Sequence, residues 1–85
     1  MNNQQRVRLA KLSAEIAEAL DNAANELEEL ASEESDKYDN MPEGLQCSEK
    51  GEALEQAASN LEQAASDCRD ALDTITGSID EAMSG

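Results

Sequence analysis

The chain lacks the residues that most enzymes use for acid–base chemistry. It has no histidine, tryptophan or phenylalanine, and Tyr38 is its one aromatic residue. Without histidine there is no Glu-x-x-His pair for a di-iron site, and no imidazole for general acid–base catalysis. Asp36, Asp39, Asn40 and Glu43 miss the spacing of a calcium-binding EF-hand. We therefore predict a protein that is not an enzyme, with no catalytic residue, no cofactor and no metal site.

Basic residues are also scarce, since six lysines and arginines stand against 20 aspartates and glutamates, for a net charge of −14. Arg6, Arg8 and Lys11 precede every acid, so residues 12–85 hold all the acids and only three bases. Such a surface repels phosphate backbones, which argues against direct binding of nucleic acid and favours a basic protein partner. The alternative is that the acidity only keeps a small helical bundle soluble.

Long apolar runs and a cysteine framework are both absent. No stretch of 18 apolar residues occurs, and the polar start Met1-Asn-Asn-Gln-Gln lacks the apolar segment of a secretion signal. Cys47 and Cys68 are too few for a disulfide-rich secreted fold. These features predict a cytoplasmic protein that does not bind membranes.

What the chain does contain is a heptad pattern. Residues 54–60 read LEQAASN and residues 61–67 read LEQAASD, one heptad written twice. Extending it places Leu54, Leu61, Cys68, Ile75 and Ala82 at d, and Ala58, Ala65, Leu72 and Ile79 at a, with Ala57, Ala64 and Ala71 on the flank at g. In the first half, the pattern places Leu9, Ile16, Ala23 and Leu30 at d, Leu20 and Leu27 at a, and Ala10, Ala17, Ala24 and Ala31 on the flank at e. Ser13 falls at a, and Leu12 beside it does not fit.

The segment around Pro42 and Gly44 separates these two stretches, because proline and glycine interrupt helices. We predict an all-α antiparallel two-helix hairpin in one domain over residues 1–85. Its helices cover about 5–36 and about 49–76, with a tip at 38–48 and Ser48 as the cap of the second helix. Gly77 and the Ser78-x-x-Glu81 capping box predict fraying or a short third helix at 78–83.

Folding about Pro42 would place large residues opposite small ones across the hairpin, a pattern that fills facing layers without voids. Examples are Leu20 opposite Ala65 and Ile16 opposite Cys68, whereas Leu30 meets Leu54. A core this thin favours self-association, with two hairpins joined through their alanine faces into a four-helix bundle. Other interpretations are a single long helix, or a disordered acidic chain that folds on binding.

Two sets of residues are candidate partner-binding sites. The first is a pair of acidic rows at i,i+3 and i,i+4 spacing, which are Glu15, Glu18, Asp21, Glu28 and Glu29 in the first helix and Asp67, Asp70, Asp73, Asp80 and Glu81 in the second. Such rows could imitate the charge of a DNA backbone. The second is the tip, where Tyr38, Met41 and Leu45 either contact a partner or fold back to plug the closed end of the hairpin.

The tip also carries a family resemblance. The segment YDNMPEGLQ at residues 38–46, with SEKG at 48–51, resembles small acidic helical-hairpin accessory proteins of bacteriophages and mobile elements. This resemblance implies a phage-type protein in the cytoplasm of a bacterial host, one that inhibits a host-defence or DNA-handling complex. It carries no catalytic residues with it.

Two functions therefore stand as hypotheses. The first is a non-enzymatic inhibitor that binds a basic protein, such as a nucleic-acid-binding or host-defence protein, by mimicking the charge of DNA. The alternative is a structural module that assembles into a helical bundle, with the acids as its solvated exterior.

Overall fold

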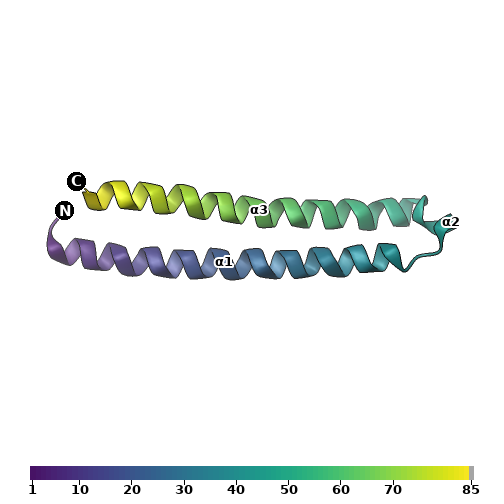
Figure 1. Ribbon diagram of the computed structural model, residues 1–85, viewed down its shortest axis with the longest axis horizontal. Helices are drawn as coiled ribbons and strands as arrows, with labels where there is room; N and C mark the ends of the chain where they lie inside the picture. The colour runs from purple at the N-terminus through teal and green to yellow at the C-terminus, as the bar shows by residue number, and fades with distance from the viewer. Residues whose placement is uncertain (85) are drawn as a thin grey trace.

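A computed structural model describes residues 1–84 as an antiparallel helical hairpin (Figure 1). Helix α1 covers Asn3–Asp39 and helix α3 covers Glu49–Ser84, and the short helix α2, Glu43–Gln46, lies in the tip between them. The two long helices lie side by side along a rod that measures 64 × 15 × 12 Å. This confirms the predicted all-α class, and the alternative of a single long helix is wrong. The predicted domain extends to residue 85, and that last position lies outside the described residues.

Helix α1 begins earlier than predicted because its first turn is capped. The Asn2 side chain accepts a hydrogen bond from the backbone N–H of Gln5 at 2.8 Å, and the Gln5 side chain accepts one from the N–H of Asn2 at 3.1 Å. This reciprocal pair satisfies two backbone donors that a helix start otherwise leaves unpaired. An Asn-x-x-Gln pattern at residues 2–5 was the available sequence signal.

Helix α3 is continuous through Gly77, so no separate helix forms at residues 78–83. A glycine inside a helix costs about 1 kcal/mol relative to alanine. Ile75 and Ile79, one on each side of Gly77, are half-buried against the hairpin seam. Their packing holds the helix together across the glycine, and the expected break is wrong.

The tip requires a glycine at residue 51. Ser48 caps α3 as predicted, with its Oγ accepting a 3.4 Å hydrogen bond from the N–H of Gly51. The backbone of Gln46, at the end of α2, lies directly on Gly51, and an added Cβ there would come within 2.7 Å of the Gln46 carbonyl carbon. No side chain fits in that space, which is why glycine stands where a capping box would have glutamate.

Alanines, not leucines, form the buried centre of the hairpin. The buried side chains are Ala24, Ala31, Ala58 and Ala65. In α3 the predicted seam is correct, because Ala58 and Ala65 were assigned to it. In α1 the a positions Leu20 and Leu27 are half-buried at the seam, but the d positions are one residue out, since the buried Ala24 and Ala31 were placed on the flank. The change brings two small residues into the seam, where they let the helix backbones approach closely.

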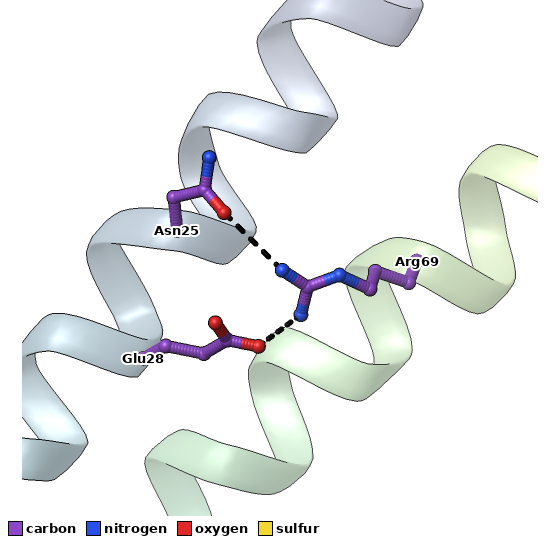
Figure 2. Close-up of polar contacts among 3 residues, drawn as sticks. All are labelled: Asn25, Glu28 and Arg69. Carbon is purple, nitrogen blue, oxygen red and sulfur yellow. Dashed lines mark hydrogen bonds and ion pairs between the residues drawn. The ribbon is translucent and has the colours of Figure 1, made fainter.

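The register also differs from the prediction. The hairpin folds about Gly44, midway between the end of α1 at Asp39 and the start of α3 at Glu49, and not about Pro42. Each predicted pair is therefore displaced by about one helical turn. The contacts of Arg69 also contradict the predicted register, which sets this residue opposite Glu15, because its guanidinium bonds to Glu28 and Asn25 (Figure 2). The predicted pairs of large with small residues, such as Leu20 with Ala65 and Ile16 with Cys68, belong to the predicted register and are displaced with it.

Candidate protein-interaction surface

All ten acids of the predicted rows are exposed. In each helix most of them lie on the side away from the seam, because the seam takes the apolar positions of the heptad, whereas Asp21 and Glu28 flank the seam and Glu28 meets Arg69 there. The two rows therefore lie along opposite outer edges of the rod, one on α1 and one on α3. The structure brings each row together along its own helix but does not join the two rows into one patch.

Few of these carboxylates have a cationic partner. Among residues 1–84 the ion pairs are Arg69 with Glu28 and Lys37 with Glu34, the latter at 2.8 Å between Nζ and Oε1. Glu28 is thus the one member of the predicted rows that is paired with a base in this part of the chain. The other carboxylates of the rows are free to attract a basic surface.

Arg69 makes a contact between the two long helices that sequence reasoning did not find. Its Nη1 donates to Glu28 Oε1 and its Nη2 donates to Asn25 Oδ1 at 3.2 Å, so one side chain of α3 bonds to two residues of α1 that lie about one turn apart (Figure 2). Its side chain is 41% exposed and that of Glu28 is 52% exposed, and exposed pairs contribute at most about 1 kcal/mol. The contact therefore specifies register more than it adds stability.

The tip residues divide between the two predicted roles. Tyr38 and Met41 are half-buried, as a plug requires, whereas Leu45 is 52% exposed. Gln46 holds the closed end by donating from Nε2 to the Tyr38 carbonyl oxygen at 3.1 Å. An open groove of about 540 Å³ lies beside these residues, lined by Lys37, Asn40, Met41, Pro42, Leu45, Ser48, Lys50 and Leu54. Sequence reasoning did not single out Lys37 or Lys50.

Partial burial raises the pKa of Tyr38 above its ordinary value of 10.0, and the nearby charges of Glu55, Cys47 and Asp39 raise it further. The pKa of Lys37 is also raised, by its hydrogen bond to Glu34 and by the charge of that carboxylate. A raised pKa in the folded state means that the folded chain binds the proton more tightly than the unfolded chain. The contribution to stability is therefore complete below pH 10 and is lost as pH rises through the folded-state values.

We expect the tyrosinate absorbance of the folded protein to appear with a midpoint above pH 10.0. The signal is clean because Tyr38 is the only aromatic residue. The matched control is the same titration in strong urea, where the midpoint should return to the ordinary value. Equal midpoints in the folded and unfolded chains would show that Tyr38 is not shielded at the tip. Alkaline loss of helicity should be smaller in Tyr38→Phe.

The hairpin has a third surface, which sequence reasoning missed. In α1 it consists of side chains that lie beside the seam and are exposed or half-buried: Leu9, Leu12, Ile16, Ala19, Ala23 and Leu30. Leu12 is 51% exposed and Leu30 is 48% exposed. The sequence signal was the misfit of Leu12, which belongs to this second stripe and not to the seam.

Helix α3 extends the same surface. Ala57, Ala64 and Ala71 each precede a seam residue by one position, as Leu12, Ala19 and Ala23 do in α1. Because the helices are antiparallel, positions that precede the seam lie on one side of the hairpin in both helices. Positions that follow the seam lie on the other side, where Arg69 meets Asn25. We call the first side the apolar face; Glu26 and Glu33 of α1 follow Ala19 at the same heptad position, and Asp67 of α3 also precedes a seam residue.

The cysteines, possible metal ligands and possible membrane spans were also considered as candidate sites. Cys47 is exposed, Cys68 is half-buried, and both are free thiols. Among residues 1–84 no group of three or more histidine, cysteine or acidic side chains is arranged to hold a metal ion. In the same range, no helix combines the length and the apolar character needed to span a bilayer.

Comparison with protein-family models, with curated proteins and with solved structures found no match. The geometry described above is therefore the basis for the function proposed below.

Proposed function

We propose that this protein is a non-enzymatic acidic interaction protein that binds and blocks a basic protein of a bacterial host. The observation that carries the proposal is the set of exposed carboxylates, nearly all unpaired, along both outer edges of a narrow rod. A surface of one sign steers an oppositely charged partner toward it and penalises partners of like charge. The resemblance at the tip supports a phage-type inhibitor of a host-defence or DNA-handling complex.

The placement of the rows suggests what such a partner looks like. A flat surface would contact one row only, because the rows lie on opposite edges. A basic cleft or channel that encloses the rod would contact both. The rod is narrow enough for this, at 15 × 12 Å across its backbone. Clefts of this kind are typical of proteins that enclose nucleic acid.

Charge density separates this proposal from full mimicry of DNA. Duplex DNA carries one charge per about 1.7 Å, so a length equal to the 64 Å rod would carry about 40. The protein carries a net charge of −14. It imitates the sign and elongated form of DNA at about a third of the charge. Affinity for a specific partner would then depend on side-chain contacts as well, and the tip groove, which Met41, Leu45 and Leu54 help to line, is a candidate for them.

The experiment is capture from a bacterial lysate on immobilised protein, identification of the bound proteins, and measurement of each affinity across salt. For the proposed partner we expect affinity to fall on the order of tenfold or more between about 50 and 500 mM salt. The triple variant Asp67→Asn, Asp70→Asn, Asp73→Asn should weaken binding strongly. The matched control replaces the same three residues with glutamate, keeps the charge, and should retain binding. An affinity that does not change with salt concentration would contradict the proposal.

A second candidate function is a structural module that assembles helical bundles. The observation in its favour is that no large side chain is fully buried in the described hairpin, so its leucines and isoleucines remain available to another helix layer. The same experiment separates the two functions. Neutralising the outer acids should remove an inhibitor's activity but leave assembly intact.

A further inference from the structure

One side of the first three turns of α1 combines positive charge with exposed apolar side chains. Three shallow hollows lie there, Arg8 lines all three, and every residue that lines them belongs to α1. The hollows therefore form one continuous surface that faces solvent and not α3. We call it the basic patch, and its charged and large exposed apolar members are Met1, Val7, Arg8, Lys11 and Leu12.

The positive charges of the basic patch have no partner in the hairpin. No acidic residue precedes Glu15, and neither Arg8 nor Lys11 forms an ion pair within residues 1–84. Further along the chain, Lys37 and Arg69 are each paired with a glutamate. In a chain of net charge −14, the start of α1 is thus where unpaired positive charge is concentrated.

Exposed apolar side chains are concentrated in the same place. Within residues 1–84 five large apolar side chains are strongly exposed, and Met1, Val7 and Leu12 are three of them. Val7 is the most exposed of the five, at 71%. Arginine beside exposed aliphatic side chains is typical of surfaces that bind proteins. A nucleic-acid backbone, in contrast, is held by polar and charged contacts to phosphate and sugar, which leave aliphatic side chains unused.

The acidic row of α1 limits the size of the partner. Glu15, Glu18 and Glu29 follow Lys11 by 4, 7 and 18 residues, which are close to whole numbers of helical turns, so they lie along the same edge of α1. A long nucleic acid or a flat lipid surface laid against this edge would meet those carboxylates and be repelled. A compact acidic surface can contact the basic patch without reaching them.

We propose that the basic patch binds a compact acidic surface of another protein, one that carries aliphatic side chains beside its carboxylates. Arg8 and Lys11 pair with the carboxylates, while Val7 and Leu12 contact the aliphatic groups. This proposal uses different residues and the opposite charge from the acidic rows, so it does not rest on the basic-partner proposal. A protein with a basic cleft and an acidic rim would satisfy both, and the basic patch would then fix which end of the rod lies at the rim.

The test is a titration of the full isotope-labelled chain, followed by amide chemical shifts at physiological salt. The probe is a short synthetic peptide of leucine and glutamate. We expect saturable shifts at Val7, Arg8, Lys11 and Leu12. A matched peptide of leucine and lysine should instead shift amides along the acidic rows, so the two peptides test the two proposals separately. Absence of binding by the leucine–glutamate peptide, or shifts confined to other residues, would overturn the inference.

Substitutions in the basic patch test the role of each kind of side chain. Arg8→Gln combined with Lys11→Gln should weaken binding of the leucine–glutamate peptide on the order of tenfold, as expected for the loss of two exposed ion pairs. The matched control, Arg8→Lys with Lys11→Arg, keeps the charge and should retain binding. Val7→Thr keeps the shape of the side chain, removes its apolar character, and should also weaken binding. Equal affinities of the neutral and charged double variants would contradict the proposal.

Two further probes separate an acidic protein from other anions. They are a short DNA duplex and phosphatidylglycerol vesicles, each added to the same labelled chain. We expect neither to shift the amides of the basic patch, because both extend along the acidic edge. Binding of either at these residues as tightly as the leucine–glutamate peptide would show recognition of phosphate and would overturn the proposal. Helical circular dichroism of every variant should match that of the unmodified protein, since the substituted side chains are exposed.

Discussion

Replacing Gly51 with alanine is expected to lower the melting temperature, while replacing Gly77 with alanine raises it. An alanine Cβ at residue 51 would lie 2.7 Å from the Gln46 carbonyl carbon and 2.8 Å from its Cα, and these backbone atoms cannot move without opening the tip. Overpacking of this kind costs about 1–3 kcal/mol. The better helix propensity of alanine returns about 1 kcal/mol, so the net effect is a loss.

Gly77 is the matched control because it lies in the same helix with nothing within 4 Å of an added Cβ. Gly77→Ala should therefore gain about 1 kcal/mol from propensity alone. For a domain of this size, 1 kcal/mol shifts the melting temperature by about 4–8 °C. Thermal unfolding followed by circular dichroism measures both variants. A rise in both melting temperatures would show that α2 does not pack on α3.

Replacing Ala24 with glutamate is expected to unfold most of the hairpin. Ala24 is fully buried in the seam between the two long helices. A carboxylate there would lose its hydration without gaining a partner, at a cost of several kcal/mol. That is comparable to the whole stability of a small domain.

The control for this substitution is Ala14→Glu, which adds the same charge to an exposed position of the same helix. It should leave helicity nearly unchanged. The measurement is helical content at neutral pH, followed by acidification, which should partly restore Ala24→Glu because the protonated side chain is easier to bury. Equal helicity in the two variants would mean that Ala24 is not in the seam.

The sequence predicted α3 more accurately than α1 for a physical reason. In α3 the duplicated heptad leaves one apolar stripe with leucine and alanine in fixed places, and the structure buries Ala58 and Ala65 as assigned. In α1 two adjacent stripes compete, one with leucine and isoleucine and one made only of alanine. Apolar area favours the first as the seam, but close approach of the backbones favours the second. Periodicity alone does not decide between them.

The register could not be predicted because it depends on the conformation of the tip. Pro42 is the conspicuous breaker, but α2 follows it and displaces the centre of the fold to Gly44. The clash at Gly51 shows that the tip is fixed by backbone contact. Contacts of that type leave no periodic trace in a sequence.

The candidate surfaces were predictable to different degrees. Exposure of the acidic rows followed from the heptad pattern and is confirmed. Their separation onto opposite edges, and the selective pairing of Glu28 with Arg69, required the register. The apolar face required more, because Leu12 and Leu30 of α1 form one surface with Ala57, Ala64 and Ala71 of α3 only when both helices are in place.

Arg69 also limits the movement of α3 along α1. Residues 54–60 and 61–67 differ only at their last position, so moving α3 along α1 by seven residues would present an almost unchanged stripe of methyl groups. Because alanine side chains are small, they interlock little and do little to prevent this change of register. The bonds of Arg69 to Asn25 and Glu28, which lie about one turn apart in α1, and the close packing of Gln46 on Gly51 make one alignment distinguishable from the next.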